Sequence, residues 1–156
     1  MSRFHRLRKA NAGDIFFIRA LEMDPANVFV HCWDEDTHRT YMNDPKAHYL
    51  IAEGVQGTAL GYAILFENEP GIIEWRRIIV ARRDDGIGSE FMQAVIDKFL
   101  DQGASKLWLD VYEDNARARH VYRALGFDEV RTEVPASDPD TTLVIMERPL
   151  GLQANR

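Results

Sequence analysis

Apolar residues recur along this chain with two spacings, and the two spacings predict different elements. Alternating or continuous apolar runs predict strands. They occur at 48–53, 59–66, 71–80, 106–112, 127–133 and 141–148. A spacing near 3.6 residues, or acidic residues at the start of a segment, predicts helices at 15–23, 34–44, 87–100 and 114–125. With a strand placed before the first helix, the predicted order is β-α-α-β-β-β-α-β-α-β-β.

The connection between the strands at 71–80 and 106–112 contains the helix at 87–100. A crossover of this kind favours a parallel pair of strands, whereas the shorter links elsewhere favour antiparallel pairs. We therefore expect an α/β (α+β) fold with a mixed, mostly antiparallel sheet of about six to seven strands, a central parallel pair and helices on both faces. The length of 156 residues favours a single domain, over 1–148, followed by a C-terminal tail at 149–156.

Composition narrows the class of protein. The net charge of −6 argues against nonspecific nucleic-acid binding and is compatible with a cationic substrate such as an amine, although solubility alone would also account for it. No apolar run approaches the roughly 20 residues that cross a bilayer, so we expect no membrane span. The single cysteine, Cys32, fits a reducing cytoplasm. The histidines lack a metal-ligand spacing, so we expect no metal.

The segment RRDDGIG, at 82–88, joins a predicted strand to a predicted helix. A helix N-terminus presents unpaired N–H groups and a partial positive charge, which attract anions. Gly86 and Gly88 allow positive φ and close approach of a ligand, and Arg83 adds charge. A pyrophosphate would fit there, although the glycines could also serve only to ease the turn. The patterns of the P-loop and of the dinucleotide-binding turn are both absent, the latter because Phe91 replaces its third glycine.

Two motifs together resemble the GNAT N-acetyltransferase superfamily, which binds acetyl-coenzyme A. The first is IIVARRDDGIG (78–88), similar to a strand ending in Val followed by Arg-x-x-Gly-x-Gly and a helix. The second is NARARHVYRALGF (115–127), similar to Asn-x-x-Ala-x-x-x-Tyr closing with Gly-Phe. The element order also fits the family from Leu7 to about Arg148. The resemblance implies a GNAT-like acyl-CoA N-acyltransferase fold.

The resemblance also implies where acetyl-CoA binds. The strand at 71–80 would diverge from its parallel neighbour, and the opening would hold the pantetheine arm, with a backbone N–H of this strand as oxyanion donor. One departure from the family is the pair Asp84 and Asp85, whose side chains we expect to point away from the phosphates. The implied cofactor-binding residues are Ile78, Ile79, Val80, Arg83, Gly86, Ile87, Gly88, Ser89, Asn115, Ala118 and Tyr122.

Tyr122 stands at the family's tyrosine position, which implies that it donates a proton to the leaving thiolate. The pKa of a tyrosine, about 10, is close to that of an alkyl thiol, so the transfer is nearly balanced. The alternative is a core tyrosine, because Tyr122 shares an apolar helix face with Ala118 and Val121.

Glu74 is the leading candidate for the base, directly or through water, because it is an acid within an apolar strand and several superfamily members carry glutamate there. Strand alternation predicts that Glu74 shares a face with Arg76, Ile78 and Val80. The alternative is an ion pair with Arg76 or Arg77. Glu22 and Asp110 are weaker candidates for the base.

The segment FVHCWDED (29–36) mixes aromatic and acidic residues where the family builds its acceptor pocket. A cation could lie against Trp33 and near Asp34 or Glu35, or the segment could be a solvated helix start.

The resemblance thus implies a cytoplasmic N-acetyltransferase that moves an acetyl group from acetyl-CoA to a primary amine of a small molecule or a protein. Because no good nucleophile is visible, we expect direct attack in a ternary complex. The alternatives are an acyltransferase using a longer acyl-CoA and a non-catalytic acetyl-CoA-binding regulatory module. A homodimer is compatible with the sequence, which fixes no interface.

Overall fold

The computed structural model describes residues 4–27, 32–81 and 86–151. All the helices and strands expected from the sequence are present, within a few residues of their predicted ends. In chain order the elements are β1 (Phe4–Lys9), η1 (Ala12–Asp14), α1 (Ile15–Met23), α2 (Glu35–Met42), β2 (Ala47–Gly54), β3 (Ala59–Glu69), β4 (Ile72–Val80), α3 (Ile87–Asp101), β5 (Lys106–Tyr112), α4 (Ala116–Ala124), β6 (Asp128–Glu133) and β7 (Leu143–Pro149).

The strands form one seven-stranded sheet in the order β1-β2-β3-β4-β5-β7-β6. Only β4 and β5 pair in parallel, and the other neighbours are antiparallel. This confirms the mixed sheet with a central parallel pair. The crossover through α3 accounts for that pair, because parallel neighbours cannot be joined by a hairpin.

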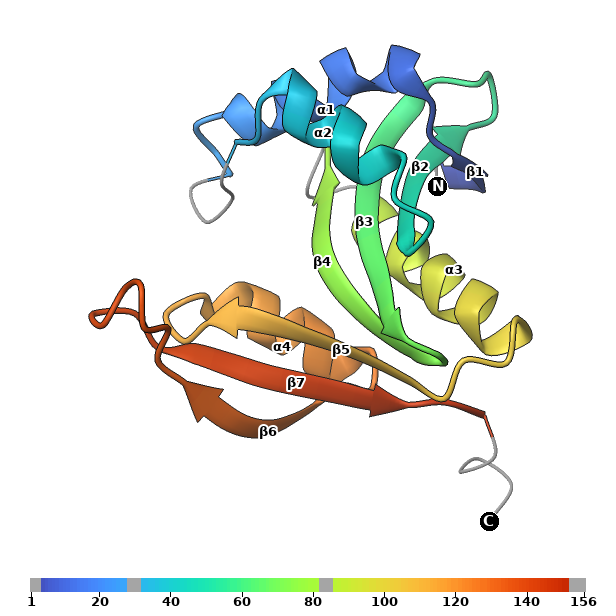
Figure 1. Cartoon of the computed structure of the whole chain (residues 1–156). Helices are drawn as coiled ribbons and strands as arrows, with labels where there is room; N and C mark the ends of the chain where they lie inside the picture. The colour runs from blue at the N-terminus through green and yellow to red at the C-terminus, as the bar shows by residue number, and fades with distance from the viewer. Residues whose placement is uncertain (1–3, 28–31, 82–85, 152–156) are drawn as a thin grey trace.

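Helices cover both faces of the sheet, and each face has its own apolar core. In Figure 1, α3 and α4 lie behind the sheet, while α1 and α2 lie together above it. The larger core joins α3 to both halves of the sheet and includes Phe91, Val95, Phe99, Leu107, Leu109 and Met146. The smaller core lies under α1 and includes Ile18, Leu21, Ile51, Tyr62 and Ile64.

A β-bulge interrupts β4 at Arg76. On the neighbouring β3, Ile64 pairs with Arg77 and the next residue, Leu65, pairs with Trp75, so Arg76 is the extra residue. A bulge of this kind shifts the alternation of side chains along the strand. Before the bulge, the odd-numbered residues Ile73 and Trp75 face the larger core. After the bulge, the even-numbered residues Ile78 and Val80 face it.

The parallel pairing of β4 with β5 is short. It covers three pairs and ends with Glu74 opposite Trp108, although β4 continues to Val80 and β5 to Tyr112. Beyond this point the two strands diverge, as Figure 1 shows. The divergence expected from the family resemblance is therefore present, and it divides the sheet into a β1–β4 half and a β5–β7 half.

The folded chain extends past the predicted domain end at residue 148. Pro149 belongs to β7, and the backbone N–H of Leu150 donates a hydrogen bond to the Ser105 carbonyl at 2.9 Å. The Leu150 side chain is buried against the larger core. The first residues of the expected tail are thus part of the domain. Within the described ranges, we find no helix long and apolar enough to span a membrane.

Candidate functional site

The divergence of β4 from β5 exposes one edge of β4. The N–H of Ala81 donates to the Leu60 carbonyl of β3 at 2.8 Å. Because backbone groups alternate in direction along an antiparallel pair, the N–H and C=O of Ile79 also face β3, and those of Ile78 and Val80 face the gap. Of the three residues expected to pair with a ligand, Ile78 and Val80 have the required direction, whereas Ile79 is directed to β3.

The glycine corner leads directly into α3. Gly86 is the N-cap residue with φ of 75°, a left-handed conformation that favours glycine. It provides no side-chain cap, so the first N–H groups of the 15-residue helix, at Ile87, Gly88 and Ser89, are left without that partner. A Cβ on Gly88 would lie 3.9 Å from a methyl group of Val80, which places the helix start beside the end of β4. This arrangement suits an anionic group at one end of the gap.

Four residues of the first motif lie outside the described residues. These are Arg82, Arg83, Asp84 and Asp85. The expectations for a phosphate-binding Arg83 and for outward-pointing aspartates therefore stay predictions.

The second motif forms α4, and two of its residues have structural roles. The Asn115 side chain caps α4 by accepting a hydrogen bond from the Ala118 N–H at 3.2 Å. Tyr122 is half-buried and packs against Phe127, with ring centroids 6.0 Å apart. Ala118 and Tyr122 both lie against the larger core. The motif thus fixes the start of α4 and holds Tyr122 on the α3–α4 side of the sheet.

The Tyr122 hydroxyl lies in a crowded environment near an acidic residue. Burial, and after it the negative charge of Asp110, raise the pKa of Tyr122 to about 12. Asp110 is on β5, two residues beyond the last pair with β4. Partial desolvation, and after it the Glu74 carboxylate, raise the pKa of Asp110, although this residue keeps solvent contact. These effects link Tyr122, Asp110 and Glu74 electrostatically at the narrow end of the gap.

Glu74 forms the ion pair that the sequence offered as an alternative role. Its two carboxylate oxygens accept hydrogen bonds from the Arg76 guanidinium at 2.8 and 2.6 Å. The Arg76 guanidinium also lies 4.2 Å from the Phe66 ring centre, on the face of the smaller core. The expected face shared by Glu74, Ile78 and Val80 is wrong, because Ile78 and Val80 pack on the larger core. The bulge at Arg76 is the physical reason.

Glu22, a weaker candidate for the base, is instead the centre of a buried polar network. Its carboxylate accepts hydrogen bonds from the Trp33 N–H (3.2 Å), His38 (2.9 Å), the Tyr62 hydroxyl (2.7 Å) and the Arg77 guanidinium (2.6 Å). The Glu22 side chain has no solvent exposure and its oxygens already accept from four donors of the fold, so its role is structural. The position of Glu22 on the apolar face of α1 was the one feature of the sequence that indicated its burial.

The residues expected from the sequence to bind the acceptor, Trp33, Asp34 and Glu35, are engaged within the protein. The Arg77 guanidinium lies 3.7 Å from the Trp33 ring centre, so one face of this ring already carries a cation. Asp34 is the N-cap of α2 and accepts a hydrogen bond from its backbone, while Glu35 pairs with Arg39 at 2.8 Å. Asp34 and Glu35 are exposed. These contacts give structural roles to all three residues.

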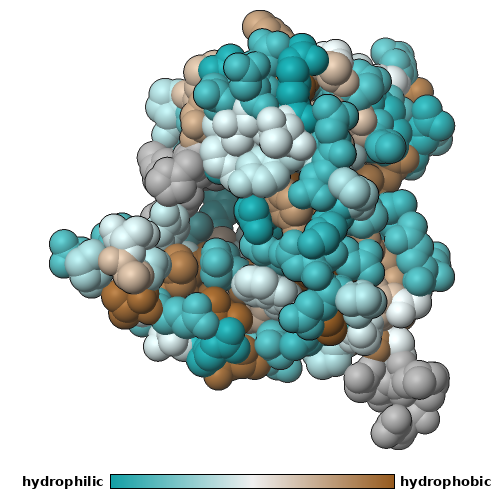
Figure 2. All heavy atoms as spheres, in the orientation of Figure 1, coloured by the Kyte–Doolittle hydropathy of each residue, from teal (hydrophilic) through white to brown (hydrophobic). Residues whose placement is uncertain are grey.

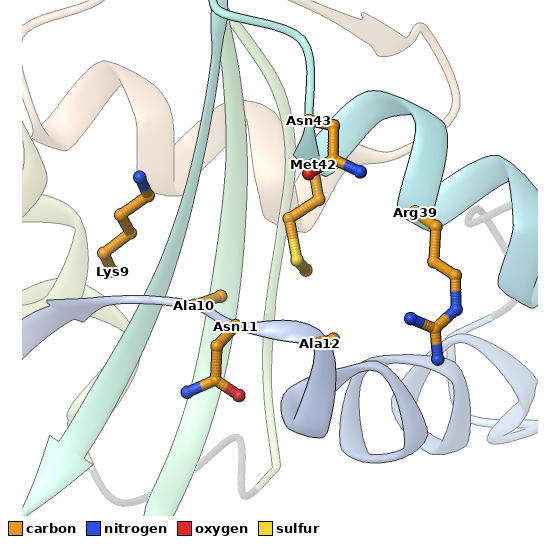
Figure 3. Close-up of a pocket in the computed structure, with 7 residues that line it drawn as sticks. All are labelled: Lys9, Ala10, Asn11, Ala12, Arg39, Met42 and Asn43. Carbon is orange, nitrogen blue, oxygen red and sulfur yellow. The ribbon is translucent and has the colours of Figure 1, made fainter.

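A pocket of about 420 Å³ lies elsewhere, between residues 9–12 and the end of α2 at Arg39, Met42 and Asn43 (Figure 3). None of the residues predicted from the sequence lines it. The surface is also hollowed between the part carrying α1 and α2 and the part carrying β5 and β7 (Figure 2), where β4 and β5 diverge. We place the candidate site in this gap, because the backbone groups of Ile78 and Val80 face it and Glu74 marks the point where the two strands part. Among described residues, no group of three or more His, Cys, Asp and Glu could hold a metal.

Comparison with known sequences agrees with this geometry. The acetyltransferase (GNAT) family matches residues 15–127. Streptothricin acetyltransferase of Streptomyces lavendulae is 31% identical over 121 residues, which are 74% of this chain and 64% of that protein. The ribosomal protein bS18-alanine N-acetyltransferase of Escherichia coli is 33% identical over 70 residues, which are 43% of this chain and 47% of that protein. The chain thus spans about half to almost two thirds of these relatives.

Solved structures share the fold. Spermidine N-acetyltransferase of Vibrio cholerae, solved with CoA and spermine, has a TM-score of 0.80 at 21% identity, with 96% of each chain covered. The ribosomal-protein-S18-alanine N-acetyltransferase of Escherichia coli has a TM-score of 0.78 at 20% identity, with 94% of each chain covered. At this identity the likeness establishes the fold.

Proposed function

The chain belongs to the acetyltransferase (GNAT) family, and from this premise we propose that it transfers an acetyl group from acetyl-CoA to a primary amine. The observation that carries the proposal is the gap between β4 and β5. It has the N-terminus of α3, where the N-cap Gly86 supplies no side-chain cap, at one end and Tyr122 beside its narrow end. Relatives named as acetyltransferases of streptothricin and of ribosomal alanine support the same class of reaction.

The gap offers groups for each part of acetyl-CoA. The backbone N–H and C=O of Ile78 and Val80 would pair with the pantetheine arm as a strand would. The N–H groups of Ile87, Gly88 and Ser89 would bind the pyrophosphate, because the N-cap Gly86 has no side chain to occupy them and the helix dipole adds positive charge. A backbone N–H of β4 directed into the gap would stabilise negative charge on the thioester oxygen.

The reaction also needs two proton transfers. An alkylammonium, with a pKa of about 10, must lose a proton before its nitrogen can attack the thioester. We assign this role to Glu74, directly or through water, with the two hydrogen bonds from Arg76 orienting the carboxylate. Tyr122 would return a proton to the leaving thiolate, since burial keeps its hydroxyl protonated at neutral pH. No covalent enzyme intermediate is required, and the amine attacks within the ternary complex.

For the acceptor we propose a chemical class, primary amines, and no single compound. The similar proteins are named as acetyltransferases of streptothricin, of alanine in ribosomal protein bS18 and of spermidine, which supports an amine as the acceptor. The excess of acidic residues in this chain and the carboxylates of Glu74 and Asp110 favour a cationic acceptor. A cytoplasmic location and a homodimer stay predictions.

A panel of amines tests the proposal. The purified protein is incubated with acetyl-CoA and with a polyamine, an aminoglycoside-type amino-sugar, free amino acids or peptides with free N-termini, and released thiol is measured. We expect turnover with at least one class and none without an amine. Butyryl-CoA in place of acetyl-CoA tests the longer acyl group. Tight acetyl-CoA binding without turnover on any amine would favour the regulatory module instead.

A further inference from the structure

Trp75 carries a buried hydrogen-bond donor that has no acceptor. The residue is 3% exposed, and its indole Nε1 is the single buried side-chain nitrogen or oxygen without a partner in the described part of the chain. Buried polar groups in proteins nearly always find a partner, because an unpaired one costs stability. A tryptophan that served packing alone would carry a cost that phenylalanine avoids. The unpaired N–H therefore indicates a role for this donor.

The position of Trp75 suggests which group it binds. It is the first residue of β4 beyond the last pair with β5, and it directly precedes the bulge. Its ring packs edge-on against Phe127, with centroids 6.2 Å apart, and Phe127 in turn contacts Tyr122. The indole therefore lies on the same side of the sheet as Tyr122, where the gap between β4 and β5 begins.

We propose that the Trp75 indole N–H donates a hydrogen bond to a carbonyl oxygen of the bound acyl-CoA. The inference rests on the proposed function, in which acetyl-CoA occupies the gap. An indole N–H can only donate, so it selects an acceptor such as a carbonyl. Two carbonyl classes are present in this cosubstrate, the thioester and the amides of the pantetheine arm. A bond to the thioester oxygen would stabilise developing negative charge, whereas a bond to an amide would position the arm.

Nuclear magnetic resonance of the wild-type protein tests the contact without relying on activity. The three tryptophan indoles are labelled with ¹⁵N, and the Trp75 signal is assigned from its loss in a Trp75→Phe variant or by sequential assignment. Saturation with acetyl-CoA should move the Trp75 indole proton downfield and slow its exchange with solvent. The same change with CoA alone would identify a pantetheine amide. A change with acetyl-CoA only would identify the thioester.

An unchanged Trp75 signal at saturation would overturn the proposal, and a signal already at a hydrogen-bonded position in the free protein would do the same. Calorimetry on the same sample measures saturation independently. Absence of binding heat in the wild type would defeat the proposed function itself. Binding heat with a silent Trp75 would defeat only the role of this residue.

The affinity for acetyl-CoA provides a second test of the proposed hydrogen bond. Trp75→Phe keeps an aromatic ring and removes the donor, and we expect acetyl-CoA to bind about threefold to tenfold more weakly. Trp108→Phe is the matched control, because Trp108 alternates with the core residues Leu107 and Leu109 and therefore points to the opposite face. Equal affinity of the folded Trp75→Phe variant and the wild type would contradict the inference. If that variant does not fold, the resonance experiment alone decides.

Discussion

Replacement of Gly88 by alanine should raise the stability of the fold and lower its affinity for CoA. Its φ is not in the left-handed region, and a Cβ there would meet only a methyl group of Val80 at an ordinary 3.9 Å. Gly88→Ala should therefore stabilise α3 by about 0.5 kcal/mol. The added methyl should block close approach of a phosphate and weaken CoA binding by about tenfold or more.

Urea unfolding and calorimetric titration measure the two effects of Gly88→Ala. Gln93→Ala, an exposed change in the same helix, serves as the control and should leave CoA affinity unchanged. Unaltered CoA affinity in Gly88→Ala would remove the phosphate from the glycine corner.

Tyr122→Phe isolates the phenol hydroxyl. The ring and its packing against Phe127 remain, so CoA affinity should stay nearly constant while turnover falls by about tenfold or more. Since the pKa of Tyr122 is about 12, the hydroxyl stays protonated across pH 7–10, and turnover of the wild type should show no loss from its ionisation there. If Tyr122 only packs, the variant should change the melting temperature and keep wild-type turnover.

Glu74→Gln and Asp110→Asn distinguish the two candidate bases through the acidic limb of the pH profile of kcat/KM. If Glu74 is the base, Glu74→Gln should lower turnover about 100-fold and abolish the limb, while Asp110→Asn keeps it. The Glu74 carboxylate raises the pKa of Asp110. If Asp110 is the base, the limb should therefore survive in Glu74→Gln and move to lower pH.

Among the elements, α1 and α2 are fixed to the sheet by the Glu22 network. Glu22 comes from α1, His38 from α2, Tyr62 from β3 and Arg77 from β4. Four donors converge on one buried carboxylate, so its charge is compensated in the fold. Docking of α1 and α2 on the sheet therefore depends on this network as well as on apolar contacts.

Glu22→Gln should destabilise the protein strongly, because it leaves the Arg77 charge without a partner. We expect the free energy of unfolding to fall by about 3 kcal/mol. Glu35→Gln removes the exposed ion pair with Arg39 and should change it by less than about 0.5 kcal/mol. Chemical denaturation of both variants measures the difference, and similar small losses would mean that the network contributes little to docking.

For the protein as a whole, the pKa shifts predict loss of stability in acid. The fold lowers the pKa of Glu22, Asp14 and Glu53 through their cationic or hydrogen-bonding partners. A lowered pKa contributes stability that is present above the ordinary carboxyl pKa of about 4 and is lost as the pH falls through the folded value. Asp110 has the opposite shift and opposes this loss in part.

Urea unfolding at pH 7, 5, 4 and 3 should therefore show a free energy of unfolding that falls mainly below about pH 5. Arg8 pairs with both Asp14 and Glu53, so Arg8→Gln should flatten the dependence. A profile that is flat in the wild type, or equally steep in the variant, would contradict this assignment of the acid sensitivity.

Local patterns in the sequence were sufficient to predict the architecture of the sheet and to identify the family. The spacing of apolar residues predicted most of the elements, and the helical crossover predicted the parallel pairing that ends at Glu74 and Trp108. The motifs around Gly86 and Tyr122 identified the family, because a turn, a helix start and a one-sided helix face are set by neighbours in the chain.

Tertiary packing decided the rest. The bulge at Arg76 depends on how β4 meets β3, and it turned Ile78 and Val80 away from the face of Glu74. The Glu22 contacts join residues up to 55 positions apart, which no local spacing encodes. The unpaired donor of Trp75 is likewise a property of its surroundings. Periodicity tells which side of an element is buried, whereas the partner of a buried polar group is fixed only when distant elements pack together.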